Sequence, residues 1–207
     1  MWMKISLTKA GKRYNRDWIF RNVSFEFVSG TAYAITGPNG SGKSTLLQAI
    51  GGAIALTEGT VAFHAETAPI PEEDHHETLA IAAPYLELIE ELSVTEFLRF
   101  HEQFKKFFPG FSVTDIIQRV GLDKAANKQI RYYSSGMKQR VKLAQAIFSD
   151  VPLVLLDEPC TNLDKEGIAL YQSLISEFCP GRLVIVSSND PVEYGFCTGL
   201  LNIMDYK

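Results

Sequence analysis

The chain has 207 residues, of which 46% are hydrophobic and 21% charged, a composition typical of one large globular domain or two closely joined lobes. The net charge is −4 and no basic run stands out, so we expect no nucleic-acid partner. The sequence has neither a signal-peptide core nor an apolar run long enough to cross a bilayer, and its three widely spaced cysteines fit a reducing compartment.

The apolar pattern predicts an α/β fold. Alternating or wholly apolar runs predict strands at 23–27, 31–36, 59–64, 79–83, 153–157, 183–187 and 200–204. Helical spacing predicts helices at 44–54, 94–107, 113–120, 135–148 and 165–178. The proline-containing acidic segment 65–78 predicts an exposed loop. Strands and helices alternate at both ends while 86–148 is nearly all helical, which indicates a mainly parallel sheet with a helical insertion.

A phosphate-binding loop is predicted between the strand at 31–36 and the helix that follows it. The stretch AITGPNGSGKST matches G-x-x-x-x-G-K-[ST], and its candidate nucleotide-binding residues are Gly37, Pro38, Asn39, Gly40, Ser41, Gly42, Lys43, Ser44 and Thr45. Glycines let backbone N–H groups turn inward around a phosphate, and the helix N-terminus adds partial positive charge. Lys43 can reach β- and γ-phosphates, and the Ser44 hydroxyl can ligate Mg²⁺.

Two further strands are expected to deliver polar side chains to the same sheet edge. The apolar run at 153–157 ends in Asp157 and Glu158, which suit a second Mg²⁺ contact and a base for the attacking water. The run LVIVSSND ends in Ser188, Asn189 and Asp190. By itself, an apolar run ending in two acids is also what a solvated strand end looks like. The phosphate loop in the same chain favours the catalytic interpretation.

A third motif, YYSSGMKQRVKLAQAI, lies about 20 residues before the acidic strand end. With the phosphate loop and Asp157–Glu158 in this order and spacing, it resembles the signature of the ATP-binding subunits of ABC transporters, over nearly the whole chain. The resemblance implies an ATPase with ATP and Mg²⁺ as cofactors. It also implies an α/β P-loop core with an N-terminal antiparallel β portion, formed by 1–85 and 149–207, and a helical subdomain at 86–148.

The resemblance further implies partners and site residues. Two subunits, identical or homologous, would pack head to tail on ATP and power a membrane-spanning permease subunit, which would hold the chain on the cytoplasmic face of the membrane. The signature residues Ser134, Ser135 and Gly136 would close over the partner's ATP, Asp164 would sense the opposite site, and Tyr14 would stack on adenine. From the residues alone, a serine-serine-glycine turn can be a plain helix cap and Tyr14 a surface tyrosine without a role.

At two positions the chain departs from the family pattern. Where the family has a glutamine that reaches the metal and the water, this chain has Pro84, with Tyr85, Glu87 and Glu90 as possible substitutes. Where the family has a histidine bonded to the γ-phosphate, this chain has Asn189, which can donate a hydrogen bond but cannot carry a positive charge at neutral pH. We therefore expect slow ATP hydrolysis. A soluble ATP-gated assembly switch and a binding-only subunit in a heterodimer remain as alternatives.

Overall fold

The computed structural model describes residues 2–66 and 68–207. They form two compact units. The first, here called the sheet unit, comprises Met1–Ile81, Pro152–Asp157 and Gly181–Lys207, and the second, called the helical unit, comprises Ala82–Val151 and Glu158–Pro180. The division expected from the sequence, with 86–148 as the helical part, stays a prediction, and the compact units differ from it in grouping 158–180 with the helices.

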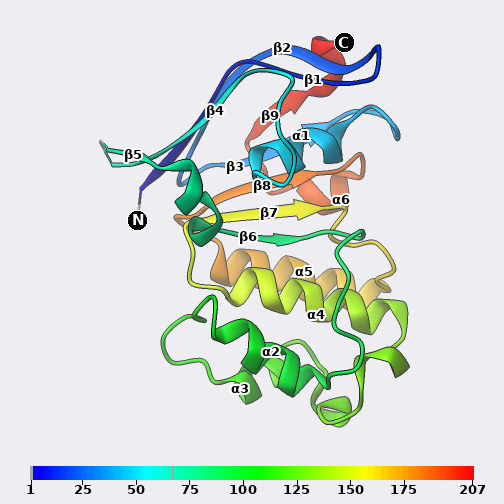
Figure 1. The fold of residues 1–207 in the computed structure, drawn as a ribbon. Helices are drawn as coiled ribbons and strands as arrows, with labels where there is room; N and C mark the ends of the chain where they lie inside the picture. Colours follow the sequence, from blue (N-terminus) through cyan, green and yellow to red (C-terminus); the bar gives the residue numbers. More distant parts are fainter. Residues whose placement is uncertain (1, 67) are drawn as a thin grey trace. The chain divides into compact units, whose positions relative to one another are not determined.

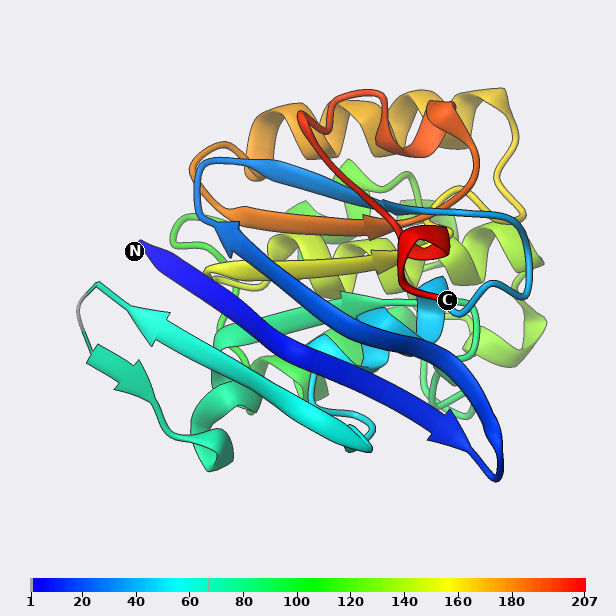
Figure 2. The ribbon, with the colours of Figure 1, turned by 90° about the horizontal axis from the view of Figure 1, so that it is seen from above.

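One layer of the sheet unit is an antiparallel sheet of β1 (Met3–Tyr14), β2 (Asp17–Val28), β4 (Glu58–Ala65) and β5 (Ala68–Ile70). The order is β2-β1-β4-β5, and Figure 2 looks onto this sheet with β1 in dark blue between β2 and β4. Met3, Ile5 and Leu7 alternate with polar residues and are buried, because successive side chains of a strand point to opposite faces.

The second layer is a five-stranded sheet, in the order β6-β7-β8-β3-β9. Its strands are β6 (Leu79–Ala82), β7 (Leu153–Asp157), β8 (Leu183–Ser187), β3 (Ala32–Thr36) and β9 (Gly199–Asn202). The pairs β7–β8, β8–β3 and β3–β9 are parallel. The expected α/β fold, with an antiparallel portion and a mainly parallel sheet, is confirmed.

Helix α1 (Lys43–Ile50) lies between the two sheets of this unit (Figure 1). Its Leu46, Leu47 and Ile50 are buried in one core cluster with residues of both sheets. The short helices η1 (Glu72–Thr78), α6 (Pro191–Tyr194) and η4 (Ile203–Tyr206) complete the unit. This packing fixes the start of α1 at the carboxyl end of β3, where ligands bind in parallel sheets.

The helical unit contains α2 (Val94–Glu102), α3 (Val113–Arg119), α4 (Ser135–Phe148) and α5 (Lys165–Phe178), with short turns η2 (Asp123–Ala125) and η3 (Ile130–Tyr132). Helices α2 and α3 both begin at capping boxes, Ser93 with Glu96 and Ser112 with Asp115, which satisfy backbone N–H groups that a helix leaves free. Helices α4 and α5 lie side by side (Figure 1).

Several sequence expectations were wrong in detail, and one strand was missed. Strand β1 was not predicted, although it is among the longest elements. The segment 65–78, expected to be a loop, contains β5 and η1. The helices expected to end at 54 and 107 end at Ile50 and Glu102. No helix among the described residues has the length and apolar character needed to cross a membrane.

Candidate functional site

The phosphate loop joins β3 to α1, as expected, and its conformation requires glycine. Gly37 and Gly42 have φ angles of +147° and +95°, which residues with a Cβ rarely adopt. A Cβ at Gly37 would lie 2.7 Å from Cγ2 of Ile203, and one at Gly42 would lie 2.4 Å from Cγ2 of Ile19. The loop is therefore held tightly against its own unit on both sides.

Lys43 begins α1 and is nearly buried, and its ammonium group lies over the loop. Its Nζ donates hydrogen bonds to the carbonyl oxygens of Gly37, at 3.0 Å, and Pro38, at 3.2 Å. Ser44 and Thr45 follow in the first turn, half-buried. Gly42 caps the helix in the left-handed conformation and no acidic residue lies in the first turn, so the positive end of the helix is not neutralised locally. This arrangement suits an anion such as a triphosphate.

Three residues that the sequence analysis missed support the loop from behind. Ile203 lies against Gly37, and Ile19 lies against Gly42. The Nζ of Lys207 donates to the carbonyl oxygens of Ser41, at 2.6 Å, and Ile19, at 2.7 Å. No local pattern could have identified them, because Ser41 and Lys207 are 166 positions apart.

Asp157 lies at the end of β7, 2% exposed, and is paired in register with Ser187 at the end of β8. The Ser41 and Ser187 hydroxyl oxygens are fully buried and have no hydrogen-bond partner among the described residues. A buried polar atom without a partner is costly unless a ligand or water satisfies it. The Ser44 hydroxyl and the Asp157 carboxylate are hard oxygen donors, so the residues present fit Mg²⁺. Their role as ligands stays a prediction.

The stretch that follows β8 reaches the phosphate loop through one residue. The side-chain amide of Asn189 donates to Oδ1 of Asn39, at 3.0 Å. The side chains of its neighbours Ser188 and Asp190 instead bond to nearby backbone groups. Ser188 Oγ accepts from the backbone N–H of Asp190, and the Asp190 carboxylate caps α6 by accepting from Val192. Of the three polar side chains expected at this edge, the structure therefore places Asn189 against the loop.

Tyr14 ends β1 at the hairpin to β2 and is 48% exposed. The Lys12 ammonium lies 4.9 Å from the centre of its ring, and Lys12 also donates to the Ala55 carbonyl. The hairpin continues into Ile19, which lies against Gly42. The chain on both sides of Tyr14 is therefore held by contacts, through Lys12 before it and Ile19 after it. The adenine-stacking role of Tyr14 stays a prediction.

In the helical unit, the predicted signature residues share a pocket of about 350 Å³ with the predicted sensing residue. Ser134, Ser135, Gly136 and Asp164 all line it. Ser134 caps α4 by accepting from the Met137 N–H, at 3.2 Å, which leaves the hydroxyl proton available to an acceptor. A Cβ at Gly136 would lie 2.9 Å from the carbonyl oxygen of Asn162, so glycine is needed there too.

Asp164 is held by two contacts. It caps α5 by accepting from Gly167, at 2.8 Å, and it lies 3.6 Å from the Arg140 guanidinium. The loop before it is fixed by Gln139 of α4, whose amide donates to the Pro159 carbonyl at 2.8 Å. Gln139 and Arg140 are further residues whose site contacts the sequence analysis missed.

Glu158 follows Asp157 in the chain and has an unusual backbone. Its φ angle is +42°, which lies in the left-handed region. This conformation is unfavourable in free energy for any residue other than glycine. Its carboxylate accepts a hydrogen bond from Thr161, at 3.4 Å. Strain of this kind persists where the surrounding structure enforces it, and it clusters at functional sites. The strain at Glu158 favours a functional role for this residue, and its role as the base stays a prediction.

Pro84 occupies the position where the family resemblance leads us to expect a glutamine, and it is exposed. Its carbonyl oxygen accepts a hydrogen bond from Nζ of Lys142 on α4, at 2.8 Å. Of the three candidate substitutes, Glu90 is already engaged by Lys138, at 2.5 Å. Glu87 is exposed and Tyr85 is 44% exposed.

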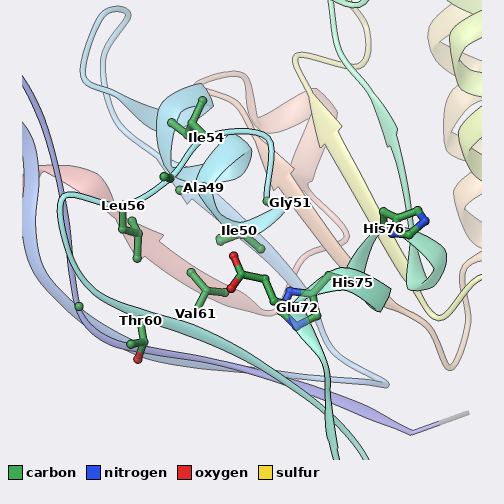
Figure 3. A pocket seen from close by; sticks show the side chains of 13 residues that line it. Ala49, Ile50, Gly51, Ile54, Leu56, Thr60, Val61, Glu72, His75 and His76 are labelled. Carbon is green, nitrogen blue, oxygen red and sulfur yellow. The ribbon is translucent and has the colours of Figure 1, made fainter.

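A separate cavity of about 430 Å³ lies in the sheet unit between α1, β4 and η1. Figure 3 shows the Glu72 side chain reaching towards Ile50 and Val61 in this cavity. His75 stacks on Phe63 with ring centres 3.9 Å apart. Among the described residues, no group of three or more histidine, cysteine, aspartate or glutamate side chains could hold a metal ion.

Comparison with known proteins finds relatives of this chain. A family model described as "ABC transporter" matches residues 20–161. The chain is 31% identical over 186 residues to an ABC transporter ATP-binding protein of Bacillus subtilis, YybJ, covering 89% of this chain and 85% of the relative. It is 32% identical over 203 residues to the cytochrome c biogenesis ATP-binding export protein CcmA of Rhizobium johnstonii, covering 94% and 89%.

Solved structures agree in fold. A putative ABC transporter ATP-binding protein of Pyrococcus furiosus superposes with a TM-score of 0.81 at 21% identity, covering 99% of both chains. A bacterial ABC transporter cassette solved as a dimer superposes with a TM-score of 0.81 at 23% identity, covering 96% of this chain and 94% of the other.

Proposed function

Because the chain belongs to the ABC transporter family and is an ATP-binding subunit of that family, we propose that it hydrolyses Mg²⁺-ATP as a dimer and thereby powers a membrane-spanning permease subunit. The observation that carries the proposal is the phosphate loop, with the buried Lys43 over it and Asn189 bonded to Asn39 beside it. Both lie in one compact unit.

The proposed chemistry assigns each residue a separate task. Backbone N–H groups of 40–45 and the Lys43 ammonium bind the β- and γ-phosphates, whose charge also favours the positive end of α1. Ser44 and Asp157 would hold Mg²⁺, which neutralises charge on the phosphate oxygens. Glu158 accepts a proton from the attacking water. Ser134 and the Gly136 N–H donate to the γ-phosphate held by a second copy.

We propose that hydrolysis is slow because Asn189 cannot supply the positive charge that an imidazolium would supply. The chain would work on the cytoplasmic face of a membrane, held there by its permease. The CcmA relatives are named export proteins, which favours export, while the cargo would be selected by the permease.

The departures at Pro84 and Asn189 favour one alternative, a soluble ATP-gated switch that uses closure rather than turnover. Copurification distinguishes the two functions. A transporter subunit is isolated from cells with a polytopic membrane protein, whereas an assembly switch is isolated with soluble partners.

The direct test is Mg²⁺-ATP turnover of the purified chain, with Glu158→Gln as the control and the molecular mass measured in the same solutions. We expect turnover that Glu158→Gln abolishes, and a dimer that accumulates with ATP in that variant. Turnover that persists in Glu158→Gln, or failure to bind ATP at all, would overturn the proposal.

A further inference from the structure

The irregular segment 83–92 is fastened to helix α4 at several points within the helical unit. The Nζ of Lys142 donates to the carbonyl oxygens of Ala83, at 3.2 Å, and Pro84, at 2.8 Å. The Nζ of Lys138 donates to the Glu90 carboxylate, at 2.5 Å. A segment without helix or strand would otherwise have few contacts to fix its path.

The chain just before α4 is joined to the same segment through its backbone. The N–H of Ile130 donates to the Leu92 carbonyl, at 2.8 Å, and the N–H of Arg131 donates to the Glu90 carbonyl, at 3.0 Å. The Arg131 guanidinium also pairs with Glu91, at 3.0 Å. Residues on both sides of Ser134 are therefore tied to 83–92.

The two lysines share a helix face with Ser134, because positions 134, 138 and 142 are four residues apart. Like charges at this spacing repel each other, so a helix gains nothing from the lysine pair alone. Each ammonium instead has oxygen partners on 83–92, and burial lowers the pKa of Lys142, with the nearby Lys138 as a smaller cause. The arrangement serves the contact with the segment.

We propose that Lys138 and Lys142 are positioning residues, which lock segment 83–92 to α4 so that displacement of the segment reorients Ser134 and Gly136. This inference rests on the proposed function for the part that Ser134 and Gly136 take in ATP binding.

Three variants and a control test the lock. Lys138→Glu and Glu90→Lys each break the ion pair, and the double variant restores it with the charges exchanged. Arg119→Glu breaks a comparably exposed ion pair with Glu177 in the same unit, so it controls for a general loss of stability. The melting temperature of all four is measured first.

The decisive measurement is hydrogen exchange of the backbone amides at 133–137 in the full chain without nucleotide. We expect exchange to accelerate about fivefold in Lys138→Glu and in Glu90→Lys, to return to within about twofold of the original rate in the double variant, and to stay unchanged in Arg119→Glu. Unchanged exchange in the single variants, or acceleration that the exchanged pair does not reverse, would overturn the inference.

A second measurement separates the lock from the proposed function. The ATP concentration that half-saturates turnover should rise about fivefold in the single variants and recover in the double variant. If exchange responds as expected while the ATP requirement does not, the lock stands and the assumed role of Ser134 and Gly136 in ATP binding is wrong.

Discussion

The side-chain amide of Asn189 donates a hydrogen bond to Oδ1 of Asn39, with the two atoms 3.0 Å apart, and so joins the strand end after β8 to the phosphate loop. The two residues are 150 positions apart in the chain. The contact shows where the Asn189 amide lies, at the position where the resemblance to ABC transporter subunits leads us to expect a histidine.

Replacing Asn189 with histidine should raise the turnover number for Mg²⁺-ATP by about tenfold, which corresponds to about 1.4 kcal/mol of transition-state stabilisation. The physical reason is that an imidazole can carry a positive charge near the γ-phosphate, which an amide cannot. Steady-state phosphate release measures the effect. Asn189→Ala, which removes the contact to Asn39 without adding a charge, is the control, and equal turnover in Asn189→His and the original chain would contradict the prediction.

Removing the Lys43 ammonium should weaken ATP binding by about a hundredfold, because charge-assisted hydrogen bonds to phosphate are among the strongest that proteins make. Lys43→Ala is compared with the original chain by titration of a fluorescent ATP analogue. Lys4→Ala removes an ammonium that pairs with Glu26 on the antiparallel sheet and should leave the affinity unchanged. Equal losses in both variants would indicate a nonspecific charge effect.

Lys207→Met should weaken ATP binding by about tenfold, because the loop carbonyl of Ser41 and the Ile19 carbonyl lose their common donor. Lys207→Arg keeps a donor and a charge and should restore most of the affinity. The same titration measures both variants. Affinity that is unchanged in Lys207→Met would show that Ile203 and Ile19 alone hold the loop.

Acid should destabilise the helical unit through His101. Burial, with a smaller contribution from Lys105, lowers the pKa of His101 to about 4 in the folded chain, and the ring contacts the Ser149 hydroxyl at 2.9 Å. Because the pKa of an unfolded histidine is about 6.5, this contribution to stability is complete above pH 6.5 and is lost as the pH falls towards 4.

The expected loss is about 1 to 2 kcal/mol of unfolding free energy between pH 7 and pH 4.5, allowing for the partial exposure of the ring. Urea unfolding of the original chain and of His101→Gln at both pH values measures it. The variant should lose less than the original chain over this interval. Parallel pH dependence of the two would show that other groups, such as carboxylates, account for the acid sensitivity.

The phosphate loop and the position of Asp157 could be predicted from the sequence because each depends on a short local pattern. Glycine spacing followed by Lys43 specifies the loop, and an apolar run that ends in an acid places that acid at a sheet edge. Neither inference needs knowledge of distant contacts.

Strand β1 was missed because its pattern is interrupted. Met3, Ile5 and Leu7 alternate, but the pairing register with β2 shifts between Leu7 and Ala10, and Lys9 has a φ angle of +47°. Such a bulge breaks the period of two on which strand prediction depends. The supports of the loop at Ile203 and Lys207 were missed for a different reason, since contacts between distant residues leave no periodicity in the sequence.

The position of β3 in its sheet also has a consequence for the order of events during synthesis. Its two hydrogen-bonded neighbours are β8 and β9, which begin at residues 183 and 199. A nascent chain that has already exposed its phosphate loop therefore still lacks both strands that hold β3, and contacts of such separation form slowly. We therefore expect the phosphate loop to reach its folded conformation only after β8 and β9 have been synthesised.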